Sequence, residues 1–258
     1  MPRYRLTLEF DGGAFCGWQV QANGPSVQAA LEAAADRMVA RLGPTVAAGR
    51  TDAGVHALAL PVHLDLEREI MPERLMSGLN HHLRHLPVVV LRASLAPEGF
   101  HARFSATARH YSYRILARRA PAALERGRVW HVARELDAER MQAAAETLIG
   151  RHDFTSFRDS ACQAASPTRT LSRLWVRKRG PLIELGASAP SFLHHQVRNL
   201  VGTLKVIGEG SRPIAFAQAA LEARERAAAG PTAPAEGLFF VAADYPGVPG
   251  QDQPKNRP

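Results

Sequence analysis

The sequence predicts an α+β fold made of two mixed α/β halves. Segments with the period-2 hydrophobicity of strands alternate with segments that have helical spacing. An order of strand, helix and strand starts again near residue 100, and no short-period repeat is present. At 258 residues the chain can bury a substantial core, as one large domain or as two smaller ones. We therefore expect one half over residues 1–99, a second over 100–245 and a flexible tail over 246–258.

In the first half, the pattern predicts two strands and two helices. Ser26 can cap a helix that ends before Gly43, and Pro72 suits the first turn of another. The run at 87–91 is apolar throughout, which predicts a buried strand. The expected elements are a strand at 4–10, a helix at 26–42, a helix at 72–83 and a strand at 87–91.

The second half repeats this alternation with more elements. The expected order is a strand at 109–116, a helix at 137–149, a pair of strands at 170–179 and 181–188, a helix at 191–209, a helix at 213–229 and a strand at 237–245. In the helix at 191–209 the apolar stripe leaves His194, Arg198, Gly202 and Lys205 together on another face. We expect that basic face to point outward.

The charge balance indicates an acidic partner. The chain has 32 Lys and Arg against 24 Asp and Glu, a formal net charge of +8. Only Lys178, Lys205 and Lys255 are lysines, so nearly all the cations are guanidinium groups, which bind phosphates and stack on bases. A GC-rich genome would also enrich arginine, but it would not by itself produce the charge excess.

The cysteines and the N-terminus bear on the cellular compartment. Cys16 and Cys162 are far apart and form no CxxC pair, so neither a disulfide framework nor a structural zinc site is expected. The start of the chain lacks the pattern of a signal peptide, and no run of about 18 apolar residues is present. We expect a soluble protein of the cytoplasm.

Several kinds of chemistry lack their usual motifs. The chain has no GxxxxGK[ST] phosphate loop, no complete dinucleotide-binding glycine motif and no GxSxG nucleophile elbow. Histidine pairs occur at 81–82 and 194–195, but without the cysteine or carboxylate spacing of a recognised metal site. The sequence therefore favours a protein without a nucleotide cofactor or a catalytic metal.

The segment GRTDAGVHA at 49–57 contains the best candidate for a catalytic group. Asp52 lies between Gly49 and Gly54, which permit a sharp turn and the close approach of a bulky partner. A carboxylate held near Arg50 or Arg198 would stay ionised, available as a nucleophile or a base. The alternative is that Asp52 only stabilises a turn.

A second candidate site is the aromatic pair Tyr111 and Tyr113 in RHYSYR. Both rings share one strand face and lie among cations. One ring could stack on a base while arginines bind phosphates, although ordinary core burial would explain either ring equally well.

Seven ordered blocks of sequence resemble the tRNA pseudouridine synthase A family over residues 4–245. They are FDGGAFCGWQVQ at 10–21, SVQAALE at 26–32, GRTDAGVHA at 49–57, FHARFSATARHYSYRI at 100–115, HDFTSF at 152–157, FLHHQVRNLVGTL at 192–204 and APAEGLFFVAADY at 233–245. The resemblance implies an isomerase that converts uridine to pseudouridine at positions 38, 39 and 40 of the tRNA anticodon stem-loop.

The resemblance also assigns roles to residues. The family's catalytic aspartate falls on Asp52, its active-site tyrosine on Tyr111, and its motif arginines on Arg50 and Arg198. Arg103 and Arg109 are further candidates for contacts with the tRNA backbone, which would make binding sensitive to salt. In this chain Gln196 stands where the family often has methionine, and we expect that difference to tune packing.

The family implies a pseudouridine synthase fold, in which two related halves share a central antiparallel sheet and a basic active-site cleft. It also implies a homodimer with no cofactor. Two other classes remain as alternatives: a noncatalytic RNA-binding protein, which would not need Asp52, and a metal-dependent nuclease, which would need a divalent ion.

Overall fold

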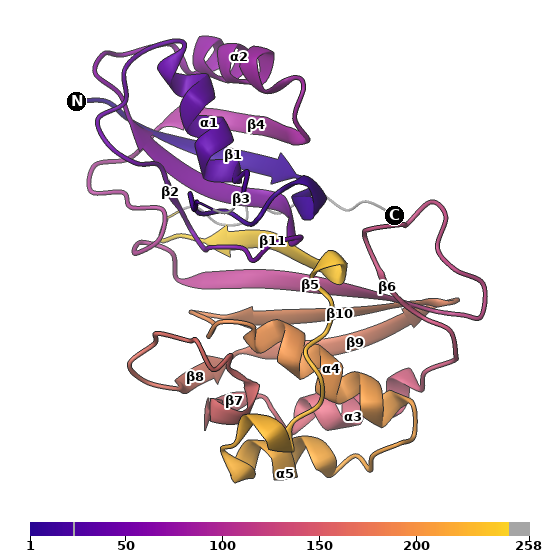
Figure 1. Cartoon of the computed structure of the whole chain (residues 1–258). Coiled ribbons are helices and arrows are strands. Elements are labelled where there is room, and N and C mark those ends of the chain that lie inside the picture. The colour runs from indigo at the N-terminus through magenta and orange to yellow at the C-terminus, as the bar shows by residue number, and fades with distance from the viewer. Residues whose placement is uncertain (23, 248–258) are drawn as a thin grey trace. The chain divides into compact units, whose positions relative to one another are not determined.

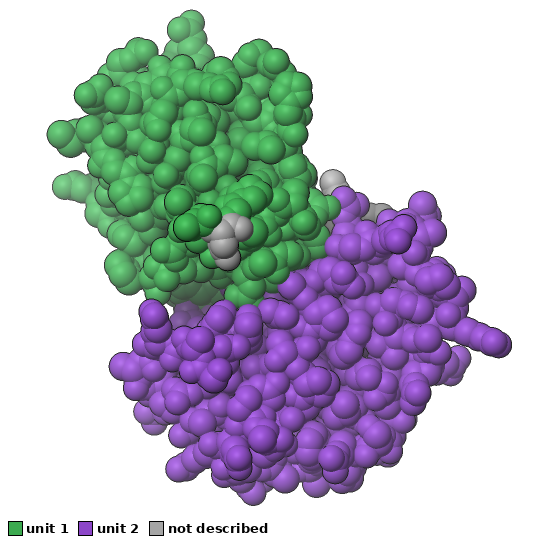
Figure 2. Space-filling view, in the orientation of Figure 1, with its two compact units in different colours: residues 1–109, 239–258 green, residues 110–238 purple. Residues whose placement is uncertain are grey.

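The computed structural model describes residues 1–22 and 24–247, and it divides into two compact units. Unit 1 comprises residues 1–109 together with the last segment from Phe239, and unit 2 comprises His110–Leu238 (Figure 2). The boundary thus follows residue 109 rather than the expected 99, and the last strand belongs to the first unit. Apart from residues 246 and 247, the predicted flexible tail lies outside the described residues.

Unit 1 is a mainly antiparallel sheet with two helices. Its strands are β1 (Arg3–Phe10), β2 (Val46–Ala47), β3 (His56–Asp65), β4 (Val88–Leu95) and β11 (Leu238–Asp244). They follow the order β4-β1-β3-β11, and β2 also pairs with β3; only the β3–β11 pairing is parallel. Helix α2 (Pro72–Leu83) packs against β4, and α1 (Val27–Asp36) packs against α2 (Figure 1).

Unit 2 contains sheet strands, a separate two-stranded sheet and three helices. Its strands are β5 (Ala108–Ala117), β6 (Trp130–Val132), β7 (Gly150–Asp153), β8 (Thr168–Leu171), β9 (Arg173–Arg179) and β10 (Leu182–Ala189). Its helices are α3 (Ala138–Glu146), α4 (Gln196–Gly208) and α5 (Phe216–Ala223). Strands β5, β10 and β9 are neighbours in that order, and β7 pairs with β8 (Figure 1).

These elements confirm the prediction of an α+β fold with two mixed α/β halves. The Ser26 hydroxyl caps α1 by accepting a hydrogen bond from Ala29 N at 3.2 Å, and α2 begins at Pro72, as expected. The predicted strand pair is the antiparallel pair β9–β10. Among the described residues, no helix is both long and apolar enough to span a bilayer.

Two expectations about burial were wrong. Strand β4 is only half-buried: it lies at the edge of the sheet, where Val88 and Val90 are buried but Val89 and Leu91 are exposed. The expected outward face of α4 is not exposed at Gly202. A Cβ at that position would lie 1.6 Å from the carbonyl oxygen of Pro231. That side of the helix is therefore packed against the 230–233 segment. A hydrophobic pattern identifies buried positions but does not reveal which small residues contact another backbone.

The ends of three helices also differ from expectation. The helix expected over 213–229 spans only Phe216–Ala223, and Arg224 after it has a φ of 50°. Helix α1 ends at Asp36, earlier than the apolar spacing suggested, and α4 begins only at Gln196. His195 has a φ of 59°, in the left-handed region, so an α-helix cannot run through it. The sequence could not predict that start, because histidine has no strong preference for this conformation.

His63 makes the stability of unit 1 dependent on pH. Its ring is buried in β3, and Nδ1 accepts a hydrogen bond from Ala102 N at 3.0 Å. The pKa of His63 is lowered from 6.5 to about 4, mainly by burial and also by the charges of Arg3 and His101, while Asp65 acts in the opposite direction. Between these two values the unfolded chain binds more protons than the folded one, so stability is lost as the pH falls.

We expect the free energy of unfolding to fall by up to about 3 kcal/mol between pH 6.5 and pH 4 because of this histidine. Urea unfolding across that range measures the change. A His63→Gln variant keeps an acceptor for Ala102 N but does not titrate, so its profile should be flatter than that of the wild type. Identical profiles would contradict the assignment.

Candidate active site

Asp52 lies in a tight turn that leads into β3. Val55 N donates to the carbonyl oxygen of Asp52 at 3.2 Å, which closes the turn over residues 52–55. Gly54, at the third position, has a φ of 79°, as a type II turn requires. The Asp52 side chain is half-buried, and Arg50, two residues earlier, is exposed. The turn thus holds a carboxylate on a backbone of fixed conformation.

The segment after β1 packs against this turn through its glycines. Gly17 has a φ of 104°, and a Cβ there would lie 2.6 Å from the carbonyl oxygen of Thr51. Trp18 N donates to that same oxygen at 3.1 Å. On the other side, a Cβ on Gly12 would lie 2.0 Å from the carbonyl oxygen of Val55. The motif FDGGAFCGWQVQ therefore shapes the Asp52 loop through direct backbone contact.

His56 and Ala57, which follow the Asp52 loop, pair with strand β11. In the parallel β3–β11 pairing, Phe239 is opposite His56 and Phe240 is opposite Ala57. The His56 and Phe239 rings stack with centroids 4.8 Å apart, and His56 Nδ1 accepts a hydrogen bond from Gly12 N at 3.0 Å. Three separate motifs therefore meet at the start of β3.

Thr51, immediately before Asp52, has an unusual environment. Its side chain is 7% exposed, and its hydroxyl has no hydrogen-bond partner among the described residues. A buried polar group without a partner costs about 1–3 kcal/mol. Such groups are rare in folded proteins and call for a specific explanation. This residue directly precedes Asp52 in the chain.

Arg109 fixes the chain just ahead of GRTDAGVHA. Its Nε and Nη2 atoms donate to the carbonyl oxygen of Ala48 at 3.1 and 3.0 Å. Nη1 donates to the Ala106 carbonyl at 2.9 Å, and Nη2 also contacts the Arg103 carbonyl. The guanidinium thus ties the 48–52 segment to the FHARFSATAR segment. Arg103 itself is exposed.

In unit 2 the two tyrosines of RHYSYR have different surroundings. Tyr113 is fully buried, and its hydroxyl donates to the Pro234 carbonyl at 2.7 Å; burial raises its pKa. Tyr111 is half-buried, and its ring lies edge-on to Phe192 with centroids 5.1 Å apart. Tyr113 is therefore a core residue, whereas Tyr111 keeps an accessible ring beside the FLHHQVRN motif.

Arg198 is held in the first turns of α4. Its Nε donates to the Ala233 carbonyl at 2.7 Å, and Ala233 N donates to the Arg198 carbonyl at 3.1 Å. The neighbouring Asn199 is buried: its Nδ2 donates to the Phe157 carbonyl at 2.9 Å, and its Oδ1 accepts from the Thr232 hydroxyl at 2.7 Å. These bonds connect the motifs HDFTSF, FLHHQVRN and APAEGLFF around Arg198.

A carboxylate–imidazole pair that the sequence did not predict lies at the start of α4. His195 Nδ1 lies 2.7 Å from Asp159 Oδ2, and Ala161 N donates to Asp159 Oδ1 at 2.8 Å. The hydrogen bond from Ala161 is the main cause that lowers the pKa of Asp159, and the bond from His195 adds to it. His195 belongs to a motif block, so it could have been found; Asp159 belongs to none.

Gln196 is buried, and its side chain is hydrogen-bonded to the backbone of Leu193, the residue before His194 and His195. Its Oε1 accepts from Leu193 N at 2.8 Å, while its Nε2 has no partner among the described residues. We expect Gln196→Met to keep turnover within about twofold and to change stability by less than about 1 kcal/mol, because losing one bond is offset by removing a buried unpaired donor. Thermal unfolding and turnover measure this, and a loss of turnover would contradict it.

The predicted site residues are divided between the two units. Asp52, Arg50, Arg103 and Arg109 belong to unit 1, where Arg109 connects the segments that carry the others. Tyr111 and Arg198 belong to unit 2.

Comparison with known proteins agrees with the motif blocks. A family model described as tRNA pseudouridine synthase matches residues 144–246. Proteins named tRNA pseudouridine synthase A are 57% identical in Rhodospirillum centenum, over 95% of this chain and 100% of the relative, and 54% identical in Nitrobacter winogradskyi, over 96% and 97%. Another in Mesorhizobium japonicum is 54% identical over 95% and 100%. With more than half of its residues identical over nearly its whole length, the chain belongs to the tRNA pseudouridine synthase A family.

Proposed function

We propose that this protein isomerises uridine to pseudouridine at positions 38, 39 and 40 of the tRNA anticodon stem-loop, in the cytoplasm, with Asp52 as the catalytic residue. Membership of the family supports the reaction and the substrate. The observation that carries the role of Asp52 is the geometry of its turn: glycines pack against the backbone on both sides and leave the carboxylate half-buried. That arrangement preorganises one carboxylate for a bulky substrate.

The reaction needs no other reactant. The bond between N1 of uracil and C1′ of the ribose breaks, the detached uracil rotates, and C5 bonds to C1′; the proton on C5 leaves and N1 gains one. Asp52 can serve by attacking the nucleotide, which gives a covalent intermediate, or by removing a ribose proton, which permits elimination. Both routes need the ionised carboxylate.

A uridine paired in a stem has to leave the helix to reach Asp52, at a cost of a few kcal/mol. Tyr111 is the proposed stacking partner for the flipped base, and its half-buried ring supports that role. Its hydroxyl would also assist loss of the proton from C5. Tyr111→Phe separates the two roles, because it keeps the ring and removes the hydroxyl.

Arginines are the proposed contacts to the substrate phosphates. Exposure supports this role for Arg50 and Arg103, and Arg198 is proposed to bind the flipped nucleotide. Arg109 is proposed to act near the RNA as well, but its bonds to three carbonyl groups favour a positioning role for the Asp52 loop. Weak dependence of tRNA binding on salt would contradict the phosphate contacts.

The protein is also proposed to form a homodimer. Support comes from edge strand β4, on which Val89, Leu91 and Leu95 are each more than 40% exposed. Light scattering should give twice the mass of the chain, and Leu91→Arg should shift the mass toward one chain if β4 is part of the interface.

The proposed activity is tested by tritium release from tRNA that carries 5-³H-uridine, in the presence of EDTA. Release without shortening of the RNA supports isomerisation. RNA fragments that disappear in EDTA would instead indicate a metal-dependent nuclease, and tight tRNA binding with no release would indicate a noncatalytic RNA-binding protein. A tRNA without uridine at positions 38–40 should release no tritium.

A further inference from the structure

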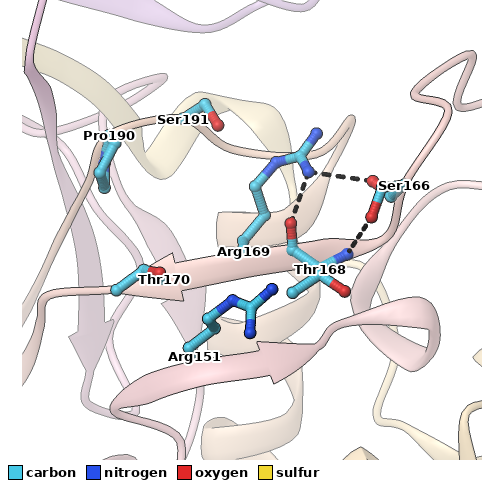
Figure 3. Close-up of a pocket in the computed structure, with 7 residues that line it drawn as sticks. All are labelled: Arg151, Ser166, Thr168, Arg169, Thr170, Pro190 and Ser191. Carbon is cyan, nitrogen blue, oxygen red and sulfur yellow. Dashed lines mark hydrogen bonds between the residues drawn. The ribbon is translucent and has the colours of Figure 1, made fainter.

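A shallow polar cavity of about 310 Å³ lies in unit 2. It is formed by the β7–β8 hairpin and the segment just after β10 (Figure 3). The residues that line it are Arg151, Ser166, Thr168, Arg169, Thr170, Pro190 and Ser191. Asp52, Tyr111 and Arg198 are not part of this lining.

The cavity lining is basic and rich in hydroxyl groups. Two arginines and four hydroxyl side chains contribute to it, and none of the described residues that line it is acidic or aromatic. Arg151 on β7 is directly opposite Thr170 on β8, so both side chains project from the same face of the hairpin. A lining of this kind suits an anion and offers no surface for stacking a base.

Arg151 is available to a ligand. Its side chain is exposed, and it makes no hydrogen bond or ion pair with any residue that the structure describes. A guanidinium without a carboxylate partner keeps its full charge and all five donors. Arg151 can therefore bind a phosphate in bidentate fashion without first breaking an internal contact.

Arg169 is fixed by the backbone and is not neutralised. Its Nη1 donates to the carbonyl oxygens of Ser166 at 2.9 Å and Thr168 at 2.7 Å, and Figure 3 shows the side chain folded back over this turn. Its Nε is buried and has no partner among the described residues. Thr168 N donates to the Ser166 hydroxyl at 3.2 Å, which tightens the same turn. The second positive charge is thus held in place at the cavity.

We propose that this cavity binds a phosphate of the tRNA backbone, through Arg151 and the charge of Arg169. The proposal rests on the proposed function for its ligand. Charge and donors recognise the phosphodiester, and the lack of an aromatic lining residue makes recognition independent of the base. The contact therefore adds affinity and orientation to tRNA binding, and it takes no part in the isomerisation.

The test compares Arg151→Gln with the wild type. The Arg151 side chain has no partner among the residues that the structure describes, so the variant should fold normally. We expect KM for tRNA, and Kd by filter binding, to rise about fivefold at 0.15 M salt, with kcat unchanged and the slope of log affinity against log salt reduced by about 1. The factor should be the same for tRNAs of different sequence.

Arg179→Gln is the matched control, because this substitution removes the same charge. Arg179 is also exposed in unit 2, and it lies outside the cavity lining. Equal effects of both variants on Kd and salt slope would overturn the proposal. A second result would also overturn the proposal. Inorganic phosphate would raise the melting temperature of the wild type but not of Arg151→Gln, while both proteins bound tRNA with the same Kd; the cavity would then bind a free anion and not the tRNA. Failure of the proposed function can be distinguished from failure of the cavity proposal. If the proposed function were wrong, the wild type would bind tRNA without releasing tritium, and the comparison of Kd values would still test the cavity.

Discussion

Asp52→Asn should reduce tritium release from 5-³H-uridine tRNA by about 10³-fold or more and leave tRNA affinity within about twofold of the wild type. The amide has nearly the same shape as the carboxylate, so the turn closed by Val55 N and shaped by Gly54 should persist. It can neither attack the nucleotide nor accept a proton. Loss of turnover with binding intact would therefore identify a purely chemical role.

The matched control for this experiment is Glu98→Gln, which removes an exposed acid from the same unit. It should behave like the wild type in both assays. If Asp52→Asn kept turnover within tenfold of the wild type, the carboxylate would not be the catalytic group. If Asp52→Asn strongly lowered both the affinity for tRNA and the free energy of unfolding, Asp52 would be a structural turn residue.

Gly17→Ala should damage the same loop from its other side. The backbone φ of 104° is strained for alanine, and the new Cβ would lie 2.6 Å from the Thr51 carbonyl oxygen and 3.2 Å from the Asp52 carbonyl carbon. The Asp52 backbone has to shift, because both atoms belong to the main chain. We expect a loss of about 2–4 kcal/mol in stability and of about 10²-fold in kcat, since a displacement near 1 Å is enough for that.

Gly43→Ala is the control that separates the effect of backbone strain from the effect of the Cβ contact with Thr51. Gly43 also has a positive φ, 137°, but no atom lies within 4 Å of the Cβ position there. This control should lose some stability and keep its turnover. Urea unfolding and single-turnover tritium release on both variants provide the comparison. Equal turnover in the two variants would show that the position of the loop does not depend on Gly17.

Local signals predicted much of the fold, and tertiary contacts decided the rest. The cap of α1 at Ser26 and the start of α2 at Pro72 depend on side chains within one turn, so the sequence sufficed. The left-handed His195 is hydrogen-bonded to Asp159, 36 positions away. No local pattern encodes such a pair, and no periodicity indicates that Gly202 meets the backbone of Pro231.

For the candidate site, the sequence identified residue types better than it identified their roles. Arg103 and Arg109 look alike in FHARFSATAR, yet Arg103 is exposed while Arg109 donates to carbonyl groups around the Asp52 loop. Tyr111 and Tyr113 are equally ambiguous until burial separates them. A guanidinium or a phenol can serve structure or substrate, and only its surroundings decide which.

The parallel pairing of β11 with β3 has a consequence for how the chain matures on the ribosome. Strand β3 emerges early, but its partner at His56 and Ala57 follows only after the whole of unit 2 has been synthesised. Unit 2, continuous in sequence, can fold first, whereas the base of the Asp52 loop waits for the last strand. Translation products that stop before Leu238 should therefore contain a folded unit 2 but no competent loop, so the proposed catalytic group would become functional last.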